Sequence, residues 1–186
     1  MLLLTDALVE GVGKTTFEYE CKYIEAAKML GGHGNTAVDF YSTVDFVKEI
    51  ARECGWDGTK TLRNRKFLSD LKDLLTRWDD APCKKVMERV DTLCSLGFAK
   101  HDWILFVDCR EPAEIQKLKE MFNGTTVLIR RLGDEMTETS NHADANVFDY
   151  EYDYVVKNYG DLEILHQEAE AFLEFLKERD CFEFEN

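Results

Sequence analysis

Short apolar runs alternate along the chain with longer segments whose hydrophobic residues recur every three to four positions. Runs of three to eight largely apolar residues predict strands, and they cover residues 1–8, 36–41, 103–107, 125–129 and 154–156. The helical period predicts helices over residues 14–30, 42–54, 67–78, 81–93, 112–122 and 162–176. Strands that alternate with helices form parallel sheets covered on both faces, so the pattern predicts an α/β fold. We therefore expect a mostly parallel five-stranded sheet flanked by helices.

Two details refine these expected helices. Ser42 and Asp45 have the spacing of a capping box, which predicts that the second helix starts there. The third helix carries a stripe of large hydrophobic residues, which predicts one buried face. The stripe consists of Phe67, Leu71, Leu74, Leu75 and Trp78.

Length and charge narrow the function classes. The 186 residues fit one domain, residues 1–186, and the 45% hydrophobic content is enough for a packed core. The net charge of −14 argues against direct nucleic-acid binding, which requires a basic surface. No apolar run approaches the ~20 residues of a membrane span, so we expect a cytoplasmic protein with no membrane association.

The acidic residues are concentrated at one end of the chain. Residues 132–186 contain 16 acidic and 3 basic residues, whereas the preceding part is nearly neutral. This acidic third could bind a basic protein partner or could simply keep the protein soluble. A basic cluster interrupts the neutral part, and it consists of Lys60, Arg63, Arg65 and Lys66. It is either an anion-binding site or a set of solvated side chains at a helix start.

Cysteine spacing gives no metal or redox motif. The six cysteines are widely separated, without a C-x-x-C pair, and several fall at apolar positions of helical patterns. We expect reduced, buried thiols.

Residues 11–16 predict a phosphate-binding loop between the first strand and the first helix. The residues are Gly11, Val12, Gly13, Lys14, Thr15 and Thr16. Glycines let backbone N–H groups approach phosphate oxygens, Lys14 would reach the β- and γ-phosphates, and Thr15 would ligate Mg²⁺. Leu8 stands where the full motif has glycine, and Glu10 adds a negative charge. The alternative interpretation is therefore a plain turn.

Further polar residues follow the expected strands. Asp108 ends the most apolar strand, where it could hold Mg²⁺ or cap the helix that Pro112 opens. Arg110 could face the same phosphates or pair with a neighbouring acid. Arg130 and Arg131 follow the next strand and point in opposite directions, so only one of them can serve a site.

The polar stretch after residue 131 lacks a clear period. Residues 132–150 predict a long loop, and loops of this length in a compact domain are usually functional or mobile. His142 lies in this loop beside Asp144, and a histidine in an exposed loop usually has no catalytic role.

Together these motifs resemble one family along nearly the whole chain. They include Gly-Val-Gly-Lys-Thr-Thr at 11–16, Ser-Thr-Val-Asp at 42–45, Gly-Trp-Asp-Gly at 55–58, Arg-Lys-Phe-Leu-Ser-Asp-Leu-Lys at 65–72, Val-Asp-Cys-Arg-Glu-Pro-Ala-Glu-Ile at 107–115, Asn-His-Ala-Asp at 141–144, Tyr-Asp-Tyr at 152–154 and Asn-Tyr-Gly-Asp-Leu at 158–162. The chain is similar to compact bacterial and phage P-loop kinases, the deoxynucleoside-monophosphate kinases and adenylate-kinase-like proteins. The resemblance implies a three-layer P-loop NTPase fold and a bacterial or phage-infected cell as the setting.

The resemblance also implies an activity and its residues. It implies transfer of the γ-phosphoryl group of ATP, with Mg²⁺, to a (deoxy)nucleoside monophosphate. The implied nucleotide-binding residues are Gly11, Val12, Gly13, Lys14, Thr15, Thr16, Asn158 and Gly160, the last two in a loop after the final strand that meets the adenine. The implied metal ligands are Thr15 and Asp108, and the implied catalytic residues are Lys14, Arg110, Arg130 and Arg131. The monophosphate would be held by Ser42, Asp45, Arg63, Arg65 and Lys66 within residues 36–100, and residues 132–150 would form a lid.

Two functions remain open at this point. The first is an active kinase. The second is a catalytically weak descendant that sequesters nucleotides or binds a basic partner, because Leu8 and Glu10 depart from the family pattern and the lid region is acidic. The sequence leaves the oligomeric state open, including a homodimer.

Overall fold

The computed structural model describes residues 2–7, 13–31, 36–95, 103–131 and 150–183. The strands are β1 (Leu2–Ala7), β2 (Ala37–Ser42), β3 (Trp103–Asp108), β4 (Thr125–Arg131) and β5 (Tyr154–Asn158). The helices are α1 (Lys14–Leu30), α2 (Asp45–Glu53), α3 (Leu62–Asp79), α4 (Ala81–Ser95), α5 (Pro112–Phe122) and α7 (Leu162–Glu183). Among the described helices, none is long and apolar enough to cross a membrane.

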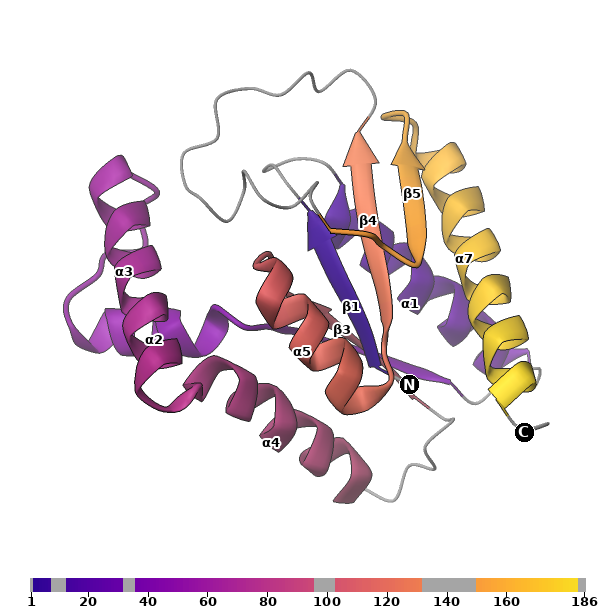
Figure 1. Cartoon of the computed structure of the whole chain (residues 1–186). Helices are drawn as coiled ribbons and strands as arrows, with labels where there is room; N and C mark the ends of the chain where they lie inside the picture. Colours follow the sequence, from indigo (N-terminus) through magenta and orange to yellow (C-terminus); the bar gives the residue numbers. More distant parts are fainter. Residues whose placement is uncertain (1, 8–12, 32–35, 96–102, 132–149, 184–186) are drawn as a thin grey trace.

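The five strands form one sheet in the order β2-β3-β1-β4-β5, and every neighbouring pair is parallel. The predicted α/β alternation and the parallel sheet are therefore confirmed. Because all strands point the same way, their carboxyl ends share one edge, drawn at the top of Figure 1. The predicted strand ends differ from the observed ones by one or two residues. Strand β5, for example, extends to Asn158 rather than ending at Val156.

Helices cover both faces of the sheet, and β3 shows how the core is divided. Alternate residues of a strand point to opposite faces. Ile104 and Phe106 pack with α1 and α7 in one cluster, whereas Leu105 and Val107 pack with α4 and α5 in the other. All four side chains are buried, as expected for a central strand of a sheet covered on both sides.

Helices α2 and α3 extend to one side of this three-layer body, at the left of Figure 1. The predicted buried stripe on α3 is wrong in part, because Leu74 is 55% exposed and Trp78 is 83% exposed. Helix α3 packs mainly against α2 and α4 and not against the sheet, so only part of its apolar stripe is covered.

The cysteine prediction is confirmed for Cys21, Cys83 and Cys109, which are buried and form no disulfide bond. Cys54 and Cys94 are exposed. Burial raises the pKa of Cys83 to about 11, with Asp80 adding to the effect.

Candidate active site

The site lies where the connections of two neighbouring strands diverge. The chain leaves β1 toward α1 on one face of the sheet and leaves β3 toward α5 on the other face. In open α/β sheets, ligands bind in the crevice that such a divergence creates at the carboxyl ends of the strands. The Nζ atom of Lys14, the first residue of α1, forms an ion pair with Oδ2 of Asp108, the last residue of β3. The two side chains are 20% and 24% exposed, so both remain accessible to a ligand.

The first turn of α1 has the backbone features of an anion site. Gly13 caps the helix with φ of +88°, a left-handed conformation that glycine adopts without strain. The first turn of α1 contains no acidic residue, and Thr15 and Thr16 are exposed. Free N–H groups and the helix dipole favour a bound anion there.

Several predicted residues fall outside the described part of the chain. These are Leu8, Glu10, Gly11 and Val12 of the phosphate loop, together with His142 and nearly all of the expected lid at residues 132–150. Arg131 ends β4, and its side chain is not described.

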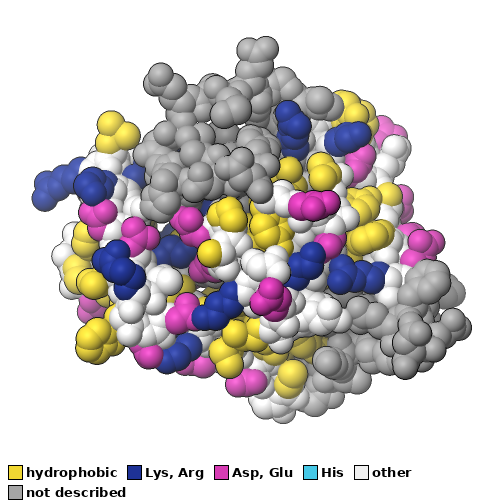
Figure 2. Space-filling model, viewed as in Figure 1, with side chains coloured by type: hydrophobic (Ala, Val, Ile, Leu, Met, Phe, Trp, Pro, Cys, Tyr) yellow, Lys and Arg dark blue, Asp and Glu magenta, His cyan; other side chains and the backbone are white. Residues whose placement is uncertain are grey.

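The basic cluster lies at the N-terminus of α3, on the same side of the molecule as the carboxyl ends of the strands. Figure 2 shows Lys and Arg side chains gathered over this end of α3. Arg63 is exposed, Arg65 donates from Nε to the carbonyl oxygen of Lys60 (3.3 Å), and Lys66 pairs with Asp70 (2.9 Å). Lys66 therefore has an acidic partner, which the basic cluster alone does not predict.

A compact polar turn fixes the start of α3. The Oδ1 atom of Asp57 accepts hydrogen bonds from the backbone N–H of Thr59 (2.9 Å), the Thr59 hydroxyl (2.7 Å) and Asn64 Nδ2 (2.9 Å). These bonds, led by that from the Thr59 backbone, hold the pKa of Asp57 below its ordinary value. Thr61 caps the helix by accepting from the N–H of Asn64 (3.2 Å). The turn therefore holds the basic cluster in a defined position.

The predicted capping box at residues 42–45 is wrong. Ser42 ends β2, α2 begins at Asp45, and its cap residue Val44 makes no side-chain cap hydrogen bond. Asp45 instead pairs with Lys48 (2.9 Å). The hydroxyl of Thr43 donates within the site and lies 3.2 Å from both the Asp108 carbonyl oxygen and Glu114 Oε2, so these residues tie β2 to β3 and α5.

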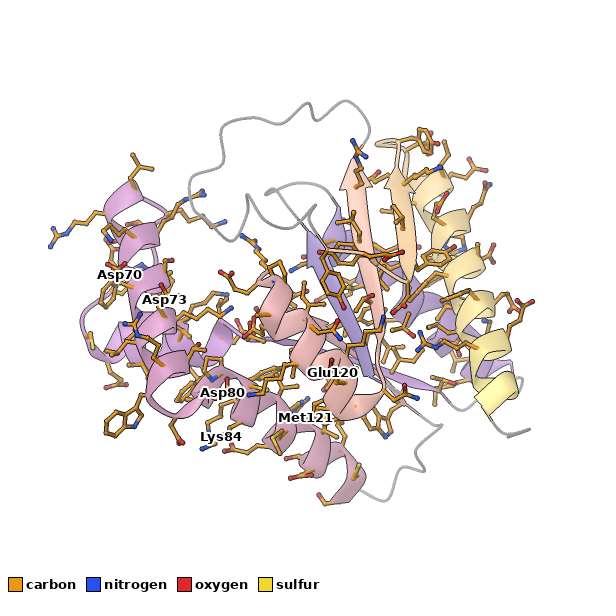
Figure 3. All side chains as sticks on the ribbon, viewed as in Figure 1. Asp70, Asp73, Asp80, Lys84, Glu120 and Met121 are labelled. Atoms are coloured by element: carbon orange, nitrogen blue, oxygen red, sulfur yellow. The ribbon has the colours of Figure 1, made fainter. Side chains whose placement is uncertain are left out.

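Two ion pairs attach α3 and its C-terminal turn to α5. Lys72 Nζ lies 2.8 Å from Glu114 Oε2, and the two side chains are only 14% and 12% exposed. Asp80, at the C-cap of α3, pairs with Lys117. Figure 3 labels Asp80 at the junction of α3 and α4, with Asp70 and Asp73 farther up α3. The helix that carries the basic cluster is thus held to the helix that follows Asp108.

The predicted arginines lie at the same edge of the sheet. Arg110 is half-buried two residues after Asp108. Arg130 lies within β4, not after it, and its side chain is exposed. Strand β4 continues past Ile129 because Arg130 and Arg131 pair with Lys157 and Asn158 of β5.

The predicted placement of Asn158 in a loop after the last strand is wrong. Asn158 is the last residue of β5 and only 6% exposed, and its Oδ1 accepts from the N–H of Gly160 (2.8 Å). Its Nδ2 lies against Gly13. Gly160 has φ of +86° and is exposed in the turn before α7.

No sequence pattern predicts the Lys72–Glu114 ion pair or the hydrogen bonds of Thr43. Their partners are separated by 42 and 71 residues, and no local period relates opposite charges over such distances.

Comparisons with known proteins give structural neighbours only. No protein-family model matches the chain, and no curated protein sequence matches it. Shikimate kinase from Aquifex aeolicus is similar in structure, with 12% identity, a TM-score of 0.48, and coverage of 94% of this chain and 96% of that chain. Shikimate kinase from Bacteroides thetaiotaomicron gives 13% identity, a TM-score of 0.41, and coverage of 95% and 98%. Shikimate kinase from Acinetobacter baumannii in complex with shikimate gives 10% identity, a TM-score of 0.44, and coverage of 95% and 93%. Because these identities and TM-scores are low, we base the functional conclusion on the residues of this chain.

Proposed function

We propose that the chain is a P-loop kinase that transfers the γ-phosphoryl group of ATP to a (deoxy)nucleoside monophosphate. The observation that carries the proposal is the meeting of Lys14 with Asp108 at the diverging ends of β1 and β3. A lysine at the start of the first helix, next to a carboxylate on the neighbouring strand, is the pair of side chains that P-loop phosphoryl transfer uses.

The residues present fit a nucleotide triphosphate with its metal. The Lys14 side chain is 20% exposed, so its ammonium group can reach a phosphate, and the N-terminus of α1 favours phosphate oxygens. Mg²⁺ usually binds one or two protein oxygens and takes its other ligands from water and phosphates. Thr15 and Asp108 are the candidates for the protein oxygens, and Mg²⁺ would neutralise charge on the transferred group.

The acceptor phosphate would bind the basic cluster on α3. Arg63 and Arg65 offer guanidinium groups that can bind phosphate through two hydrogen bonds, and the turn around Asp57 holds them in position. Arg110 follows β3 and Arg130 lies near the end of β4, so both are at the carboxyl edge of the sheet, where cationic side chains would stabilise the transition state. Residues 132–150 would supply the lid that excludes water.

The test is a turnover assay with a panel of acceptors. Purified protein is incubated with ATP, Mg²⁺ and each ribo- or deoxyribonucleoside monophosphate, with shikimate as a competing acceptor, and products are separated by chromatography. We expect a nucleoside diphosphate with at least one monophosphate and none with Lys14→Ala. The matched control is Lys22→Ala, which removes an exposed lysine from the same helix. If shikimate were the only acceptor phosphorylated, the proposed nucleotide acceptor would be wrong, but the proposed kinase activity would stand.

We infer a second candidate function from the acidic third of the chain, namely binding of a basic protein partner. Helix α7 presents a row of exposed carboxylates that supports it, which are Glu163, Glu170, Glu174 and Glu178. Absence of both turnover and ATP binding would favour this function. It would then be tested by titrating a basic protein at increasing salt, since such complexes weaken as salt screens the charges.

A further inference from the structure

Asn158 joins two separate parts of the candidate nucleotide site. On one side its amide lies against Gly13, where an added Cβ would overlap Asn158 Nδ2 and lie 3.4 Å from Asn158 Cγ. On the other side its Oδ1 accepts the N–H of Gly160 at 2.8 Å. One side chain therefore spans from the cap of α1 to the turn before α7.

Both contacts occur where the backbone is left-handed. Gly13 has φ of +88° and Gly160 has φ of +86°. Two glycines in this conformation have broad conformational freedom before folding, so contacts from a neighbouring side chain help to fix them. Asn158 is suited to that role because it is 6% exposed and is the last residue of β5, which pairs with β4.

The chemistry of the amide also matters at this position. An asparagine offers an acceptor and a donor on one planar group, whereas an aspartate offers acceptors only. A carboxylate here would still accept from Gly160, but it would put a negative charge beside the helix N-terminus that we assign to phosphates. Like charges at this range repel.

We infer that Asn158 is a positioning residue for ATP, holding Gly13 at the cap of α1 and the turn at residues 159–161 in the geometry that binds nucleotide. This inference rests on the proposed function. Asn158 acts through Gly13 and Gly160 and not by contact with the base. Its removal affects the nucleotide side of the site and leaves the acceptor side on α3 unchanged.

The test compares Asn158→Asp and Asn158→Ala with wild type by calorimetric titration of ATP and by steady-state kinetics. The matched control is Asn123→Asp, which adds the same charge at the opposite end of the sheet, after α5. We expect ATP affinity to fall about tenfold or more in both Asn158 variants, with the KM for the acceptor unchanged. We expect wild-type affinity in Asn123→Asp.

Glycine substitution supplies a second arm. Gly13→Ala places a Cβ into the Asn158 amide, so the double variant Gly13→Ala/Asn158→Ala should bind ATP no more weakly than Gly13→Ala alone. Additive losses would overturn the inference, because independent roles add.

A third arm does not depend on catalysis. Hydrogen exchange of the backbone without nucleotide should be faster in Asn158→Ala at residues 13–17 and 159–161, and unchanged in α3. Unchanged exchange at these residues would overturn the inference. If wild type binds ATP and both Asn158 variants bind it equally well, the inference is wrong and the proposed kinase stands. If wild type itself binds no ATP, both are wrong.

Discussion

Removal of the Lys72 ammonium tests whether the buried pair with Glu114 holds α3 to the body of the protein. Breaking a buried ion pair by deleting one partner costs about 3–5 kcal/mol, because the remaining charge stays buried. Here both side chains retain slight exposure, and the Thr43 hydroxyl remains near Glu114. We therefore expect Lys72→Met to lower the free energy of unfolding by about 2–3 kcal/mol. With a urea m-value of ~2 kcal/mol/M, the midpoint would fall by about 1–1.5 M.

The assay is urea unfolding followed by far-UV circular dichroism, with a double-mutant cycle. Adding Glu114→Gln to Lys72→Met removes the unpaired buried charge. The loss of unfolding free energy in the double variant should therefore be smaller than the sum of the two single losses by about 1 kcal/mol or more. The matched control is Lys66→Met, which breaks an exposed pair on the same helix and should cost less than about 1 kcal/mol. The reasoning is refuted if Lys72→Met costs no more than Lys66→Met, or if the cycle shows no coupling.

Two further predictions concern groups outside the candidate site. Burial alone would raise the pKa of Asp153, but hydrogen bonds from Lys119 and Thr126 hold that pKa below its ordinary value. Because the pKa is lowered in the folded state, the ionised carboxylate stabilises the fold above the unfolded-state pKa, and this stability is lost as the pH falls. Thermal unfolding should show Asp153→Asn about 1 kcal/mol less stable than wild type near pH 7, and the difference should disappear below about pH 4. An equal difference in stability at both pH values would contradict this. Cys54 is exposed, whereas Cys83 is buried and has a pKa of about 11. After brief iodoacetamide treatment at pH 8, mass spectrometry should therefore find Cys54 alkylated well before Cys83. Equal alkylation rates would contradict the burial of Cys83.

The sequence predicted the parts of this molecule that depend on local pattern. Helix and strand periods gave the α/β alternation, and parallel strands bring their carboxyl ends together, so Lys14 and Asp108 were expected at one edge. The ion pair between them agrees with that expectation.

The features that the sequence did not reveal depend on contacts between distant segments. Asn158 followed an apolar run that looks complete at Val156, and only pairing with β4 extends the strand and buries the amide. Trp78 falls on a regular helical stripe, but a period does not show whether anything packs against it. The capping-box spacing at Ser42 was overridden because β2 pairs with β3 through Ser42 itself.

The central place of β1 in the sheet has a consequence for how the chain folds. It is the first strand in the sequence, yet its two neighbours are β3 and β4, with Leu2 opposite Leu105 and Leu3 opposite Thr125. These partners lie roughly a hundred residues later, and such high contact order slows folding. During synthesis on the ribosome, β1 has no strand to pair with until β3 and β4 have emerged. The candidate site depends on this long-range pairing, because the β1–β3 contact brings the start of α1 next to Asp108.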